Sequence, residues 1–131
     1  HPRTKKNFGL FKLNKRIKSM KNLILTEPLG YLDFLHIMSN SKFVLTDSGG
    51  IQEETTVLGV PCVTIRNNTE RPITVKEGTN ILVSTDNAKV IEACNSIISG
   101  LKGNPVKAKI PKFWDGKAAN RVLDVLVKNI S

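Results

Sequence analysis

The residues best suited to chemistry lie in one run, TDSGGIQEE, at positions 46–54. Gly49 and Gly50 let the backbone approach a phosphate closely, and the Ser48 hydroxyl can donate a hydrogen bond to it. If a helix begins at this run, its unpaired N–H groups and positive dipole end also favour an anion. Small residues before a helix also serve close packing alone, so the three residues by themselves leave both interpretations open.

Several acids accompany this turn. Glu54 falls about one helical turn after Gly50, from where a carboxylate can accept hydrogen bonds from both hydroxyls of a ribose. Asp47 and Glu53 are further acids nearby, and we interpret both as support for the loop or the helix start, where Asp and Glu are favoured. The acid and base of a proton-transfer reaction are not identified by these residues.

Short apolar runs alternate with longer amphipathic ones, which predicts an α/β fold with a parallel, Rossmann-like sheet flanked by helices. We expect strands at 23–26, 43–46, 62–65 and 81–84, and helices at 10–20, 31–40, 51–58 and 87–99, with a last helix after Asp115. Asp86 and Asp115 are predicted N-caps, and Gly59 is predicted to end a helix in the left-handed conformation. Ligands of such sheets bind beyond the carboxyl ends of the strands, where the turn at 48–50 must lie.

Length and composition predict one globular domain over residues 1–131, with 40% hydrophobic and 24% charged residues. No apolar run approaches the roughly 20 residues that cross a bilayer, so we expect a cytoplasmic protein without a membrane partner. Cys62 and Cys94 show no metal-ligand spacing and are predicted to be buried free thiols. We expect neither a metal nor another cofactor.

The net charge of +9 is concentrated before Glu27, the first acid. An anionic partner is therefore plausible, and a basic nucleic-acid-binding module is one reading of the run. Aromatic residues make up only 5% of the chain and no nucleic-acid-binding motif accompanies the charges, so we expect a solvated basic face and no nucleic-acid partner.

The 46–54 run resembles the signature of the non-hydrolysing UDP-N-acetylglucosamine 2-epimerase family. The resemblance extends over essentially the whole chain through LGVP at 58–61, TERP at 69–72, HPRT at 1–4, EPL at 27–29, EGTN at 77–80 and WDGKAA at 114–119. It implies the second domain of a two-domain GT-B fold, with the N-terminal domain missing from a chain that starts at His1 without an initiating Met. It also implies UDP-GlcNAc or UDP as ligand, a homodimeric intact enzyme and a role in cell-surface polysaccharide biosynthesis.

The resemblance also implies residue roles. Ser48, Gly49 and Gly50 would contact the diphosphate and Glu54 the ribose. Phe34 would stack near the uracil, although it could equally pack in the core.

The remaining roles concern three charged or titratable residues. Arg71 would contact phosphate, or else pair with a neighbouring acid. His1 and Arg3 are the candidate catalytic residues facing the crevice, although a frayed basic terminus is nearly as good an interpretation.

The implied reaction interconverts UDP-GlcNAc and UDP-ManNAc by eliminating UDP and adding it back. This chain supplies only the stabiliser of the departing UDP, so we expect the isolated chain to be inactive. The alternatives are the donor-binding domain of a GT-B glycosyltransferase, a hydrolysing 2-epimerase and, from another class, the nucleic-acid module.

Overall fold

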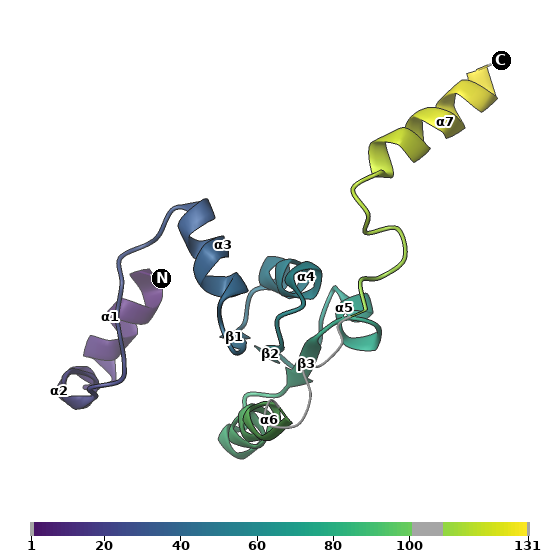
Figure 1. Cartoon of the computed structure of the whole chain (residues 1–131). Coiled ribbons are helices and arrows are strands. Elements are labelled where there is room, and N and C mark those ends of the chain that lie inside the picture. The colour runs from purple at the N-terminus through teal and green to yellow at the C-terminus, as the bar shows by residue number, and fades with distance from the viewer. Residues whose placement is uncertain (1, 101–108, 131) are drawn as a thin grey trace. The chain divides into compact units, whose positions relative to one another are not determined.

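The computed structural model describes residues 2–100 and 109–130, and Figure 1 shows its helices and strands. The chain divides into two units, His1–Leu35 and His36–Ser131, which are described separately. The single domain predicted over 1–131 stays a prediction.

The first unit contains α1 (Pro2–Leu10) and α2 (Asn14–Ser19), and α3 (Tyr31–Ser39) begins within it. The predicted helix at 10–20 is therefore wrong in its bounds. Lys12 takes a positive φ of 55°, which a helix cannot contain, and this residue separates α1 from α2.

The predicted strand at 23–26 does not form, because the described residues there are neither helix nor strand. A strand is stable only when a neighbouring strand satisfies its backbone groups, and the described sheet consists of other segments. Ile24, which the prediction placed in a buried strand, is 84% exposed.

The second unit is built on a parallel sheet of three strands in the order β1-β2-β3, namely β1 (Val44–Thr46), β2 (Cys62–Ile65) and β3 (Asn80–Val83). Val44 is aligned with Cys62 and Cys62 with Asn80, so the three strands start nearly level. The predicted α/β class with a parallel sheet flanked by helices is confirmed.

The two faces of the sheet differ in chemistry because side chains alternate along a strand. Val63 of β2 packs with Ala93 and Ile97 of α6 (Asn87–Gly100) in an apolar cluster. The neighbouring residue Thr64 points the other way and bonds to Asn80 among buried polar side chains. In Figure 1, α4 (Gly49–Leu58) and α5 (Pro72–Lys76) lie on that second side of the sheet, opposite α6.

Local signals set most helix ends. Gly59 ends α4 at φ 71°, the predicted left-handed conformation. The Asp86 carboxylate accepts a hydrogen bond from the Ala88 N–H at 2.8 Å, which confirms it as the cap of α6. Asp115 accepts one from the Lys117 N–H at 3.1 Å, but α7 (Ala118–Ile130) begins only at Ala118, so Asp115 precedes the N-cap position and the prediction that it caps the helix is wrong.

Two helices depart from the prediction. α4 begins at Gly49 rather than at Ile51, so both glycines of the turn belong to its first turn. α5 was not predicted. It begins at Pro72, whose fixed φ and missing N–H suit the first position of a helix.

Candidate functional site

The candidate site lies where the three parallel strands end. Ser48 follows β1, Arg66 follows β2 directly, and Ser84 follows β3. Because the strands are parallel, these carboxyl ends share one edge of the sheet. The Arg66 N–H donates to the Val83 carbonyl at 2.8 Å, so the segments after β2 and β3 adjoin.

The 48–50 turn leads directly into α4. The Ser48 backbone is extended, with φ −79° and ψ 133°, and its hydroxyl makes no capping hydrogen bond. Its own N–H instead donates to the Thr46 hydroxyl oxygen at 3.1 Å, which fixes the entry to the turn. α4 is ten residues long, so its first N–H groups carry a developed dipole without a side chain capping them. This arrangement suits a bound anion.

Arg66 is a cation beside this turn that sequence reasoning missed. A Cβ placed on Gly49 would lie 3.9 Å from Arg66 Nη1, so the guanidinium adjoins the glycine backbone. Its ion pair with the exposed Glu70 is long, at 3.7 Å. The available signal was position, because a cation directly after a buried parallel strand lies at the ligand-binding edge.

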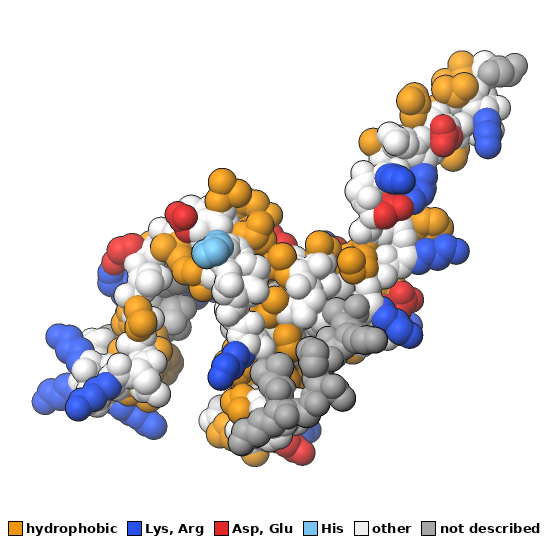
Figure 2. Space-filling model, in the orientation of Figure 1, with side chains coloured by type: hydrophobic (Ala, Val, Ile, Leu, Met, Phe, Trp, Pro, Cys, Tyr) orange, Lys and Arg blue, Asp and Glu red, His pale blue; other side chains and the backbone are white. Residues whose placement is uncertain are grey.

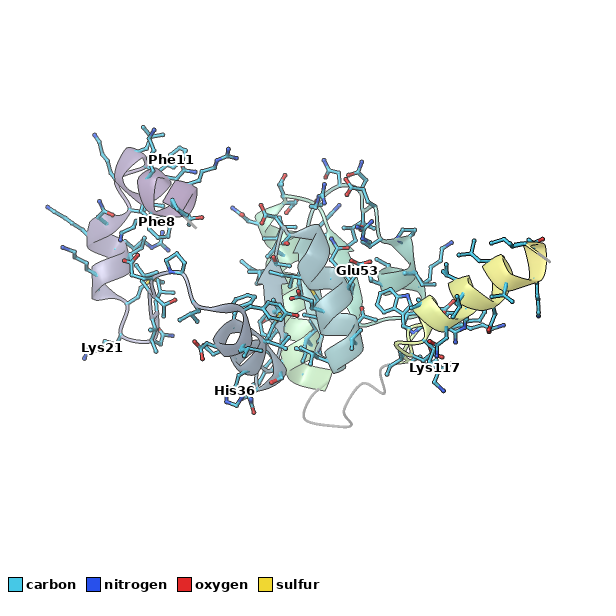
Figure 3. The ribbon with its side chains drawn as sticks, turned by 90° about the horizontal axis from the view of Figure 1, so that it is seen from above. Phe8, Phe11, Lys21, His36, Glu53 and Lys117 are labelled. Carbon is cyan, nitrogen blue, oxygen red and sulfur yellow. The ribbon has the colours of Figure 1, made fainter. Side chains whose placement is uncertain are left out.

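Arg71 follows the second of its two predicted alternatives in this structure. Its Nε lies 3.0 Å from Glu53 Oε1, and both side chains are about two-fifths exposed. Glu53 extends from α4 (Figure 3), so this pair ties the 69–71 loop to the helix that carries the turn. The predicted contact of Arg71 with phosphate stays a prediction.

Gln52 joins the same two segments from inside the protein, and its side chain is fully buried. Its Nε2 donates to the Ser48 carbonyl at 3.3 Å, while its Oε1 accepts from the Thr69 hydroxyl at 2.6 Å and from Asn80 Nδ2 at 3.0 Å. The Thr69 hydroxyl oxygen in turn accepts from the Arg71 N–H at 2.9 Å. The turn and the loop therefore share one buried amide, which sequence reasoning also missed.

Glu54, the predicted ribose ligand, is half-buried on α4. Its position in the helix places it about 6 Å along the axis from Gly50 at 1.5 Å per residue. The structure thus brings Ser48, Gly49, Gly50, Glu54 and Arg71 into one unit around α4.

The other predicted site residues belong to the first unit. Phe34 lies on α3 and is 37% exposed, so it is not buried in the core. Met38, on the same helix, is buried. Arg3 lies on α1 and is exposed. His1 lies outside the described residues. The roles assigned to these three stay predictions.

Two segments that carry the family resemblance meet within the first unit. A pocket of about 400 Å³ is lined by residues 25–28 and by Pro2, Thr4, Lys5 and Phe8. Lys5 Nζ donates to Glu27 Oε1 at 2.8 Å, which raises the pKa of Lys5 and lowers the pKa of Glu27. This pocket gathers parts of HPRT and EPL that are more than twenty positions apart in the sequence.

The basic residues of the first unit are spread over its surface, as expected of a solvated face. Lys5, Lys6, Lys15 and Lys18 are all exposed, and Figure 2 shows blue side chains projecting around this unit. In the described residues, no helix is long and apolar enough to span a membrane. The same part of the chain holds no group of His, Cys, Asp or Glu side chains placed to bind a metal ion.

Both cysteines are free. Cys62 is fully buried, and that burial raises the pKa of its thiol. Cys94 is only half-buried, so the prediction of two buried thiols is correct for Cys62 alone.

The chain was also compared with known proteins. A family model described as UDP-N-acetylglucosamine 2-epimerase matches residues 1–127. The UDP-N-acetylglucosamine 2-epimerase of Methanocaldococcus jannaschii is 44% identical over 128 residues, which cover 96% of this chain and 33% of that protein. The Escherichia coli K12 protein of the same name is 36% identical over 118 residues, covering 89% of this chain and 31% of the relative.

Solved structures agree as well. The crystal structure of the Methanocaldococcus jannaschii enzyme in complex with UDP-GlcNAc and UDP superposes with a TM-score of 0.80 at 44% identity, covering 98% of this chain and 34% of that one. The Neisseria meningitidis enzyme bound to UDP-GlcNAc gives a TM-score of 0.76 at 34% identity, with the same coverage.

The chain spans about a third of the length of these relatives. Within that third, the fold superposes on the solved structures and the family model matches residues 1–127. The chain therefore belongs to the UDP-N-acetylglucosamine 2-epimerase family.

Proposed function

We propose that the chain binds UDP and UDP-GlcNAc, with the diphosphate at the 48–50 turn. The observation that carries the proposal is the open first turn of α4, where Ser48 makes no capping hydrogen bond and Arg66 adjoins Gly49. A diphosphate there would meet backbone N–H groups, a hydroxyl and a cation together. A relative 44% identical to this chain carries UDP-GlcNAc and UDP in its crystal structure, which supports the same ligands here.

The proposed roles of individual residues extend this site. Glu54 accepts hydrogen bonds from the ribose hydroxyls, and Phe34 stacks on the uracil. Arg71 pairs with Glu53 at 3.0 Å and exchanges that partner for phosphate when nucleotide binds. Such an exchange replaces one charge-assisted contact by another, so its cost is small.

In the whole enzyme this third of the protein acts as the second domain of a GT-B fold that interconverts UDP-GlcNAc and UDP-ManNAc. Elimination of UDP leaves an unsaturated sugar, and re-addition after proton transfer gives the epimer. The turn and its cations stabilise the charge that develops on the departing UDP. The proton-transfer groups belong to the part of the relatives that this chain does not span, and the enzyme acts as a homodimer.

Calorimetry and NMR test this proposal. The 131-residue chain should bind UDP and UDP-GlcNAc, and NMR of its mixture with UDP-GlcNAc should show no manno product. Absence of UDP binding refutes the nucleotide site. Turnover by the purified chain refutes the assignment of proton transfer to the remaining two thirds.

The salt dependence of binding separates nucleotide from polyanion recognition. Binding of nucleic acid by the basic face would weaken steeply between about 50 and 200 mM salt, whereas contacts to UDP in a pocket should weaken less. Family membership favours the nucleotide sugar over both nucleic acid and a glycosyl acceptor.

A further inference from the structure

We infer that Gln52 is a positioning residue, whose buried amide holds the 48–50 turn and the 69–71 loop in the geometry that receives a diphosphate. The inference rests on the proposed function and adds to it a residue that touches no ligand itself.

Both polar atoms of the Gln52 side-chain amide form hydrogen bonds to segments of the proposed site. Nε2 donates to the carbonyl of Ser48, the residue that opens the turn, at 3.3 Å. Oε1 accepts the hydroxyl proton of Thr69 at 2.6 Å. Gln52 therefore fixes the backbone of one segment and the side chain of the other through a single planar group.

The link continues to the cation of the loop. The Thr69 hydroxyl donates to Gln52 and its oxygen accepts from the Arg71 N–H at 2.9 Å, so the position of the Arg71 backbone depends on the amide. The Arg71 carbonyl accepts from the Thr74 hydroxyl at 2.7 Å, which anchors the loop to the first turn of α5. Three consecutive hydrogen bonds thus connect Ser48 to Arg71.

Asn80 holds the amide in one orientation. Its Nδ2 donates to Gln52 Oε1 at 3.0 Å, and its Oδ1 accepts from the Thr64 hydroxyl at 2.6 Å. Because a hydroxyl and an amide N–H both point at Oε1, a rotated Gln52 amide would place N–H groups against donors. Thr64 of β2 and Asn80 of β3 therefore fix the orientation of the Gln52 side-chain amide.

Burial makes this arrangement sensitive to substitution. Gln52, Asn80 and Thr64 are at most 4% exposed, so water cannot replace a lost partner without opening the site. A side chain that filled the same space without polar atoms would leave the Thr69 hydroxyl without its acceptor and the Ser48 carbonyl with only its helical backbone donor. The turn and the loop would then be joined only through the partly exposed Arg71–Glu53 pair, and their relative position would be less tightly fixed.

The test compares binding of UDP with binding of uridine. Gln52→Met keeps the length of the side chain and removes both polar ends. Thr69→Val cuts the same link from the loop side at a half-buried position that tolerates the change if the first variant fails to fold. Thr55→Val is the matched control, because Thr55 is equally buried on the same helix and its hydroxyl donates to backbone carbonyls within α4, at 2.8 Å to Ile51 and 3.2 Å to Gln52.

We expect Gln52→Met and Thr69→Val each to weaken UDP at least about fivefold while uridine changes less than about twofold, since only the phosphates need the turn. The double variant should lose little more than the weaker-binding single variant, because both substitutions break one link. Thr55→Val should bind UDP within about twofold of the wild type whatever its loss of thermal stability.

Calorimetry well below each unfolding temperature separates positioning from stability. Unchanged UDP affinity in a folded Gln52→Met or Thr69→Val variant overturns the inference while leaving the proposed function intact. A loss of UDP affinity in Thr55→Val as large as that in Gln52→Met also overturns it. So does a loss of affinity in Gln52→Met that is equal for UDP and uridine. Failure of the wild-type chain to bind UDP overturns both.

Discussion

Replacing Gly50 by alanine should strengthen the fold and weaken nucleotide binding at the same time. Gly50 is the second residue of α4, and a Cβ placed on it meets no atom within 4 Å. Alanine favours helix over glycine by about 1 kcal/mol and restricts the unfolded chain. We therefore expect the free energy of unfolding to rise by about 0.4–1 kcal/mol.

The open space at Gly50 is where a diphosphate would approach the helix. A methyl group there keeps the phosphate from the first-turn N–H groups, and a hydrogen bond to a charged group contributes about 1.5–3 kcal/mol. Loss of one such bond corresponds to roughly a tenfold to hundredfold weaker UDP affinity. Uridine should bind Gly50→Ala as it binds the wild type, because it carries no phosphate.

Gly78 provides the contrasting glycine. A Cβ there would lie 2.5 Å from the Thr56 hydroxyl oxygen and 2.6 Å from the Thr74 carbonyl oxygen, well inside van der Waals contact. Gly78→Ala should destabilise by about 1–3 kcal/mol, as overpacking of a well-filled interior does. The unfolding temperature should therefore rise for Gly50→Ala and fall for Gly78→Ala.

Calorimetry with UDP and uridine, together with thermal unfolding, measures all of these effects. A folded Gly50→Ala variant that binds UDP as tightly as the wild type would refute the placement of the diphosphate at this turn. A lower unfolding temperature for Gly50→Ala would instead refute the conclusion that its Cβ meets open space.

Four further predictions concern charged groups. Glu54→Gln should weaken both UDP and uridine by roughly 1–3 kcal/mol if the carboxylate accepts the ribose hydroxyls; a loss limited to UDP would contradict that role. Glu53→Gln should leave uridine unchanged and alter UDP by less than about 1 kcal/mol, because it weakens only a partly exposed ion pair with Arg71; calorimetry with both ligands checks the two variants. The Arg121 hydrogen bond lowers the pKa of Asp115 to about 2, so its contribution to stability should be present above the unfolded value near 4 and be lost as the pH falls towards 2; an NMR titration midpoint near 4 would exclude the pair in solution. The K5A/K6A/K15A/K18A variant should keep UDP affinity within a factor of a few, because these lysines are exposed and salt screens solvated charges; calorimetry showing a hundredfold loss would move the phosphate site to these residues.

Local chemistry explains what could be predicted without the structure. Small residues between an apolar strand and an amphipathic helix predict a turn, and this pattern is visible at 48–50. Gly59 ends α4 because it adopts a positive φ without strain, and Asp86 caps α6 through an N–H two residues away. Each of these signals acts over a few residues, so the sequence displays it directly.

The predicted strand at 23–26 and the predicted helix at 10–20 were wrong because the local pattern does not decide by itself whether an element forms. Residues 23–26 are as apolar as a buried strand but have no strand beside them in the described sheet. Residues 10–20 carry a helical pattern that the positive φ of Lys12 interrupts. Apolar content specifies a tendency, and pairing or packing decides whether the element forms.

The sequence by itself determined the α/β class, the position of the glycine-containing turn at the end of β1, and the family to which the chain belongs. Only the tertiary structure decided which partners the polar side chains take. Gln52 bonds to Thr69 and to Asn80, which lie 17 and 28 positions away, and Arg71 pairs with Glu53 on another element. Such contacts depend on which elements stack on the sheet and at what register, and no periodicity along the chain encodes them.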